Sequence, residues 1–143
     1  MLPMSTRQQL VESWLDGRSV NAAARSAGVS KRVAHEYLLA CGEAATEHHV
    51  NAFAAYECEE PLRQKIQTVD GTTAVLVLGD KTGLIVSWTT AERDDFSVLG
   101  LHVMAHNFVR ERGAGSSEAS TPAVKAGLAK RAMTVPQMVK AFG

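Results

Sequence analysis

The stretch NAAARSAGVSKRVAHEY, residues 21–37, decides how the first third of this chain folds. Its first half consists of small side chains, it breaks at Gly28, and its second half is charged. Two helices cross closely only where the side chains at the contact are small, and the turn between them needs a residue that accepts a left-handed backbone. The stretch therefore predicts two helices that pack through Ala24 and are joined by a turn at Gly28.

Start and stop signals on both sides of this stretch predict further helices. Ser5 or Thr6 caps a first helix that ends near Gly17, and its apolar residues recur at helical spacing. Ser19 caps a second helix over residues 20–27, and Ser30 caps a third that ends at Gly42. Residues 43–60 are acidic and rich in alanine, and they predict a fourth helix that Pro61 ends. The apolar stripe expected on this fourth helix is Val50, Phe53 and Ala54.

The pattern changes after residue 61. A short helical piece is expected over residues 62–67, followed by TTAVLVLGDKTGLIVSWTT, residues 72–90, which predicts a β-hairpin with its turn at residues 79–83. A helix over residues 91–112, with apolar Leu101, Met104, Ala105 and Phe108, is expected to cover the hairpin. A free strand edge would remain, and self-association through that edge or that helix is the expected remedy.

These elements predict an α+β fold that is mostly helical and falls into four segments. They are a helix-turn-helix domain over residues 1–42, an acidic connecting helix over 43–60, a β-hairpin and helix for dimerisation or partner binding over 61–112, and a linker with a basic helical tail over 113–143. The linker is recognised by its small residues, GAGSSEASTP.

Charge is distributed unevenly although the formal net charge is zero. Residues 43–60 carry five Glu and no Lys or Arg, whereas residues 96–143 carry six Lys or Arg and two Asp or Glu. A zero total argues against indiscriminate nucleic-acid binding, and the acidic helix should turn away from DNA. Without a membrane helix or a signal segment we expect a cytoplasmic protein, whose cysteines, Cys41 and Cys58, are reduced.

The third helix should expose residue types that read DNA grooves. Arg and Lys donate to guanine, a Glu carboxylate accepts from cytosine, and a Ser near a helix start can hold a phosphate. The exposed residues of this kind are Ser30, Lys31, Arg32, His35 and Glu36.

On the residues SVNAAARSAGVSKRVAHEYL, the chain resembles the helix-turn-helix DNA-binding superfamily, in particular the three-helix type of resolvases, transposases and small phage or plasmid repressors. The resemblance covers residues 5–42 only. It implies that residues 30–36 read bases while Arg7, Arg18 and Arg25 touch phosphates. The alanine-rich second helix and a His at position 35 depart from the usual pattern and leave the target sequence open.

Other chemistries are weaker in this sequence. An αα-hairpin without a nucleic-acid role is the structural alternative to the motif. The spacing of Cys41, His48, His49 and Cys58 matches no compact zinc site, and His102 with His106 suits an exposed or interface stripe better than a metal. Ser97, Asp94 and Asp95 lack the turn of a hydrolase nucleophile. We therefore expect no enzyme activity, no cofactor and no metal.

The sequence thus predicts a DNA-binding transcriptional regulator, a homodimeric repressor of phage, plasmid or mobile-element type that binds double-stranded DNA. The alternative is an effector that binds a host or defence protein, through strand addition at the hairpin edge, and whose helix-turn-helix controls its own gene. The operator, the sign of regulation and any small effector stay open.

Overall fold

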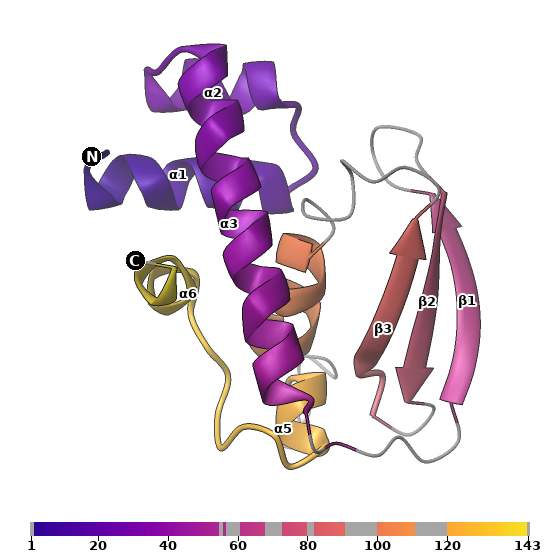
Figure 1. Cartoon of the computed structure of the whole chain (residues 1–143). Helices are drawn as coiled ribbons and strands as arrows, with labels where there is room; N and C mark the ends of the chain where they lie inside the picture. The colour runs from indigo at the N-terminus through magenta and orange to yellow at the C-terminus, as the bar shows by residue number, and fades with distance from the viewer. Residues whose placement is uncertain are drawn as a thin grey trace.

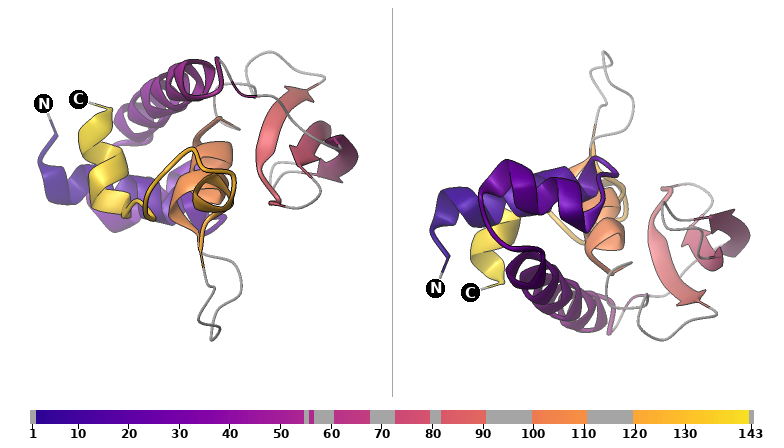
Figure 2. Two further views of the ribbon diagram at one scale, coloured as in Figure 1. Left: turned by 90° about the horizontal axis from the view of Figure 1, so that it is seen from below. Right: turned by 90° about the horizontal axis from the view of Figure 1, so that it is seen from above.

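The computed structural model of the chain describes residues 2–54, 56, 61–67, 73–79, 82–90, 100–110 and 120–142. A group of helices stands beside a three-stranded antiparallel sheet (Figure 1). The views of Figure 2 agree that all three strands lie on one side of the helices and that β3 is the strand nearest to them. The α+β class predicted from the sequence is confirmed.

The chain begins with three helices joined by short turns, α1 (Met4–Leu15), α2 (Val20–Ala27) and α3 (Lys31–Ala52). The predicted cap of α2 is confirmed, because Ser19 Oγ accepts a hydrogen bond from the Ala22 amide at 3.1 Å. The predicted cap of α1 is wrong. Ser5 and Thr6 lie inside the first turn of α1, and Pro3, whose backbone is extended, precedes the helix.

Small residues let these helices approach one another. Ala23, Ala24 and Ala34 are all buried in the main core, together with Leu10 and Val11 of α1. The predicted burial of Ala24 and of the inward face of the third helix is therefore confirmed.

Gly42 does not end the third helix, which runs on to Ala52 as one helix of 22 residues. The expectation of a helix end there, and of a separate acidic helix after it, is wrong. Gly42 is buried inside this helix, at a close contact: a side chain at Gly100 would lie 3.0 Å from the Gly42 carbonyl oxygen and would collide with Thr46 Oγ1. The absence of a side chain at Gly100 thus allows α3 to meet the segment that begins at residue 100.

The buried side of the second half of α3 also differs from the expected stripe. Val50 is 63% exposed and Ala54 is exposed, whereas Ala45 and His49 are buried. The expected stripe assumes a helix that starts after Gly42. The packing instead continues the inward face of α3 from Leu38 and Cys41.

The sheet consists of β1 (Pro61–Gln67), β2 (Thr73–Gly79) and β3 (Ile85–Thr90), in the order β1-β2-β3. The hairpin of β2 and β3 is confirmed, while the helical piece expected over residues 62–67 is wrong. Every residue of β1 pairs with β2, from Pro61 opposite Gly79 to Gln67 opposite Thr73. This ladder outweighs the helix propensity of the Gln and Lys residues in the segment.

One face of the sheet packs against helical residues. Leu76, Ile85 and Trp88 form a small core cluster with Val103, which belongs to the helical segment that starts at residue 100. In this segment residues 100–104 are α-helical, and η1 (Ala105–Val109) is a turn of π-helix. The predicted covering helix is confirmed here, and its residues 91–99 and 111–112 lie outside the described part.

Leu101, Met104, Ala105 and Phe108, expected to cover the hairpin, are buried instead in the main core with residues of the first three helices. Of the exposed or interface stripe expected at His102 and His106, the exposed form is wrong. His106 Nε2 donates a hydrogen bond to the Gly83 carbonyl at 2.7 Å, and the His102 ring lies 5.7 Å from the Trp14 ring. Both side chains are partly buried because other elements pack over them.

Two short helices end the chain, α5 (Pro122–Lys125) and α6 (Val135–Ala141). The predicted helix start near Val135 is confirmed, and a capping box joins Thr134 and Gln137. Met138 and Val139 of α6 are fully buried, and α6 packs against α1. The basic tail thus contributes to the same core cluster as the first three helices, and α3 spans the expected boundary between residues 42 and 43.

Candidate nucleic-acid interface

The turn between α2 and α3 sets the direction in which α3 starts. Gly28 has φ +71°, a backbone that side-chain-bearing residues rarely adopt, and a Cβ there would meet nothing within 4 Å. Backbone conformation, not space, therefore requires the glycine. The Val29 amide donates to the Ala24 carbonyl at 3.0 Å, and Ser30 Oγ accepts from the Val33 amide at 3.2 Å. These bonds fix both ends of the turn.

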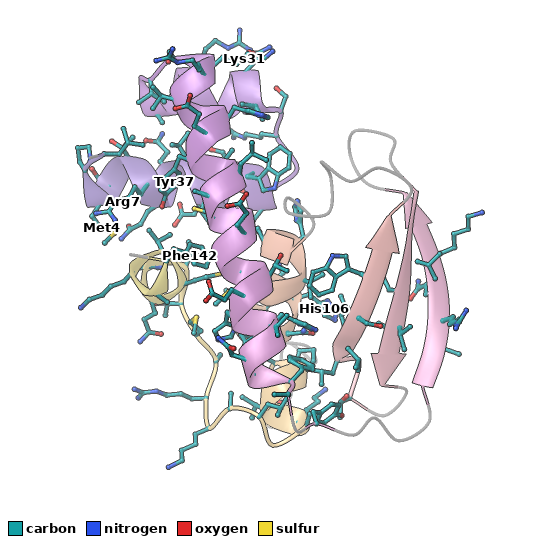
Figure 3. The ribbon with its side chains drawn as sticks, viewed as in Figure 1. Met4, Arg7, Lys31, Tyr37, His106 and Phe142 are labelled. Carbon is teal, nitrogen blue, oxygen red and sulfur yellow. The ribbon has the colours of Figure 1, made fainter. Side chains whose placement is uncertain are left out.

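The first two turns of α3 separate cleanly into two sides. Val33, Ala34, Tyr37 and Leu38 are buried or partly buried. The exposed residues are those predicted to read DNA, Ser30, Lys31, Arg32, His35 and Glu36. The structure thus brings all five together at the free end of α3, where Figure 3 shows Lys31 at the tip of the molecule.

Arg32 and Glu36 form an ion pair that does not lock either side chain. Arg32 Nε and Glu36 Oε1 are 3.8 Å apart, and the two side chains are 84% and 67% exposed. An exposed pair at this spacing on a helix contributes about 0.3–0.5 kcal/mol at most. Arg32 can therefore exchange Glu36 for an acceptor on a ligand.

Arg18 and Arg25 border the same end of the molecule. Arg25 is exposed in the last turn of α2, and Arg18 follows α1 and is also exposed. Arg18 Nη1 donates a long hydrogen bond, 3.4 Å, to Ser26 Oγ, and Gln9 Nε2 donates to the Ser26 carbonyl at 2.8 Å. Ser26, near the end of α2, is thus hydrogen-bonded both to Arg18 and to Gln9 of α1.

Arg7 lies apart from the other predicted DNA contacts. It projects from α1 beside Tyr37, well away from Lys31 (Figure 3). Its Nε is buried and has no hydrogen-bond partner among the described residues. Of the eight residues predicted to touch DNA, the structure places seven at one end and Arg7 elsewhere.

The neighbours of Arg7 are neutral polar groups. Burial is the main cause that raises the pKa of Tyr37 and raises the pKa of Cys41 to about 11, while Arg7 lowers both slightly. The Tyr37 hydroxyl lies next to the Cys41 thiol without good hydrogen-bond geometry. Cys41 is a buried free thiol that stays protonated at neutral pH, so it is no nucleophile.

Negative charge lies farther along α3. Glu43 and Glu47 are exposed on its second half, at least seven residues beyond Glu36. With a rise of about 1.5 Å per residue, Glu43 is roughly 18 Å from Lys31 along the helix axis. The acidic part of α3 is therefore separated from the exposed basic end.

The histidines other than His35 serve packing in this fold. His49 Nε2 donates to the Val86 carbonyl at 2.6 Å, and its ring stacks on Phe53 and meets Trp88 edge to face. Burial lowers the pKa of His48 and of His49, and lowers the pKa of His102 to about 4. Among the described residues no three Asp, Glu, His or Cys side chains gather as metal ligands. Cys58, Asp94, Asp95 and Ser97 lie outside the described part.

Sequence reasoning missed the polar contacts that attach the sheet. Asn107, fully buried in η1, donates from Nδ2 to the Ile85 carbonyl at 2.9 Å and accepts at Oδ1 from the Ile85 amide at 2.8 Å. The signal in the sequence is Asn107 itself, a polar residue within an apolar helical run.

No protein-family model, curated protein or solved structure matches this chain. In the part of the chain that the structure describes, every helix is too short or too polar to cross a bilayer.

Proposed function

We propose that this protein is a sequence-specific DNA-binding transcriptional regulator that reads the major groove with the first two turns of α3. The observation that carries the proposal is the exposed cluster of Lys31, Arg32 and His35 at the free end of α3, directly after a left-handed turn at Gly28. In helix-turn-helix proteins the N-terminal residues of the second helix of the motif contact base edges. Here α2, the turn and α3 supply the corresponding parts.

Arg18 and Arg25 are proposed as phosphate contacts near this helix start. Both are exposed, and both belong to segments that precede α3 in the chain. Phosphate contacts position a protein on the duplex, while base contacts specify the sequence. Ser30 and the N-terminal amides of α3 add a further place for a phosphate, because a helix N-terminus carries a partial positive charge. Arg7 is not part of this proposed surface.

The regulator is proposed to act as a homodimer on an inverted repeat, and a repressor of a phage, plasmid or other mobile element would suit its size. One small module reads few bases, and two modules combine their contacts. Leu101, Met104 and Phe108 of the covering helix are buried in the core, so these three side chains are not proposed as the dimer contact. The dimer interface therefore stays a prediction.

The test is selection of bound fragments from random duplex DNA with the full chain, together with the salt dependence of binding to the selected fragment. We expect an enriched inverted repeat and a logarithmic salt slope of about −0.9 for each phosphate contacted. A chain without preference for any duplex at low salt would refute the proposal. Analytical ultracentrifugation of the complex tests the dimer separately.

A further inference from the structure

The two edges of the sheet are built differently. At the β3 edge, the Asn107 side chain hydrogen-bonds to both the amide and the carbonyl of Ile85, and His49 donates to the carbonyl of Val86. Val86 is the extra residue of a bulge, because Ser87 pairs with Val77 and Ile85 with Leu78. This edge is therefore occupied by side chains of the helices.

At the opposite edge the described residues add no further strand. In the described part of the chain β1 pairs with β2 alone, and no described element lies beyond it in either Figure 1 or Figure 2. Leu62, Arg63, Gln64 and Lys65 are all exposed, and Leu62 is 53% exposed. Unpaired backbone groups along such an edge are a template for a further strand.

The side chains of β1 alternate between two environments. Arg63 stands opposite Val77 and Lys65 opposite Val75, so both cations share one face of the sheet with two partly buried valines. Leu62 and Gln64 stand opposite Leu78 and Leu76, on the face that packs against the helices. One face of the edge is thus basic and the other is apolar or neutral.

This alternation disfavours a second copy of the chain as the added strand. Antiparallel pairing of β1 with itself keeps each face on its own side, so Arg63 or Lys65 would stand directly opposite Arg63 or Lys65 of the other copy. Like charges directly opposite each other destabilise a sheet. The charge pattern that complements β1 is acidic.

We propose that β1 binds an acidic, extended segment of another protein by antiparallel strand addition. The pattern follows from the register: read from its N-terminus, the segment has an acidic residue opposite Lys65, a polar residue opposite Gln64, an acidic residue opposite Arg63 and an apolar residue opposite Leu62. The backbone supplies affinity and the alternating side chains supply selectivity. This surface is separate from the DNA-reading end of α3, and the proposal does not depend on DNA binding.

The test uses the full chain and a synthetic blocked peptide with the core sequence Glu-Thr-Glu-Val between threonines. We expect saturable binding by calorimetry at low salt, with amide shifts of β1 in the nuclear magnetic resonance spectrum. Replacing Arg63→Glu and Lys65→Glu together should weaken binding roughly tenfold, since two cross-strand pairs change from attractive to repulsive. The same double variant should gain affinity for a Lys-Thr-Lys-Val peptide.

Two controls separate strand addition from general attraction of charges. Lys130→Glu with Arg131→Glu changes two exposed cations elsewhere and should leave peptide binding unchanged. Peptides N-methylated at alternate residues on one edge should lose binding, and those methylated on the other edge should keep it. If the β1 charge reversal lowers the melting temperature, Arg63→Gln with Lys65→Gln replaces it, with the same direction expected.

Several outcomes would overturn the proposal. If the acidic peptide binds the wild type and the β1 variants equally, the charges of Arg63 and Lys65 do not select it. If both N-methylated series bind equally, the peptide does not bind by strand addition. Dimerisation of the wild type through β1, or loss of duplex DNA affinity in the charge reversal with no effect on the peptide, would assign the edge to another partner. Failure of DNA binding alone would leave this proposal intact.

Discussion

Arg32 is the exposed side chain whose replacement tests base reading most directly. Arg32→Ala should weaken binding to the selected duplex by about 1–3 kcal/mol and relax the preference at one base position. The free energy of unfolding should change by less than about 0.5 kcal/mol, because the ion pair with Glu36 is exposed. Mobility shifts against single-base variants of the selected site measure both effects.

Arg131→Ala is the matched control, since Arg131 is an exposed arginine outside the proposed surface. It should leave the affinity and the base preference unchanged. Equal loss of affinity for all sequences in Arg32→Ala would reassign Arg32 to phosphate contact, and no loss at all would contradict its role.

His102 should make the stability of the fold depend on pH. Burial, helped by Arg110, lowers its pKa to about 4. Between the ordinary value near 6.5 and this lower value, the unfolded chain binds a proton that the folded chain does not bind, so stability falls as the pH falls. We expect a loss of up to about 2 kcal/mol from this residue between pH 7.5 and pH 5.

His102→Phe keeps an aromatic ring beside Trp14 and removes the titration. Chemical denaturation at several pH values should show that the variant gains stability relative to the wild type as the pH falls through this range. His48 and His49, whose pKa values are also lowered by burial, act equally in both proteins. Parallel stability curves would show that His102 does not titrate in this way.

At the scale of elements, the crossing of α3 with the segment after residue 100 depends on Gly100, which lies against the Gly42 carbonyl and Thr46. Gly100→Ala should lower the free energy of unfolding by about 1–3 kcal/mol, because the new methyl group meets the Gly42 carbonyl and Thr46 Oγ1. Thr46→Ala removes one of these obstacles, together with the hydrogen bond from Thr46 Oγ1 to the Gly42 carbonyl at 2.8 Å.

Denaturation of both single variants and the double variant measures the coupling. We expect the double variant to be more stable than the sum of the single losses predicts, since the residues share one contact. Additive losses would mean that the two residues act independently.

This crossing also explains where sequence reasoning failed. A glycine after a run of helical residues usually marks a helix end, and nothing local shows that Gly42 instead lies inside a helix whose packing partner, Gly100, is 58 positions away. By contrast, Ser19 and Ser30 were recognised as caps, because their bonds reach only three residues ahead.

The missed strand β1 has a different cause. Leu62 and Ile66 are four residues apart, a spacing that fits one face of a helix as well as one face of a strand, and Gln and Lys favour helices. The partner β2 decides between these tendencies. The same limit applies to Arg7. Helical periodicity predicted the exposed face of α3, but the position of Arg7 depends on how α1 crosses α3.

For the whole molecule, Asn107 is the main polar link that we can test between sheet and helices. Asn107→Ala leaves the amide and the carbonyl of Ile85 without their partners in a buried place, so we expect a loss of about 2–4 kcal/mol in the free energy of unfolding. Hydrogen exchange of the Ile85 amide should accelerate more than that of amides in α1.

Asn51→Ala is the control, because Asn51 is an exposed asparagine on α3. Its exchange pattern should match that of the wild type. Uniform acceleration of all amides in Asn107→Ala would mean that the sheet and the helices unfold as one unit, and unchanged exchange at Ile85 would contradict the role of this amide.

The length of α3 links the two ends of the molecule mechanically. A helix of 22 residues spans about 33 Å, and the crossing at Gly42 lies about 16 Å from Lys31. The inward side of α3 is buried from Ala34 to His49, so the helix holds its exposed N-terminal residues at a fixed distance from the sheet residue Val86, to which His49 donates.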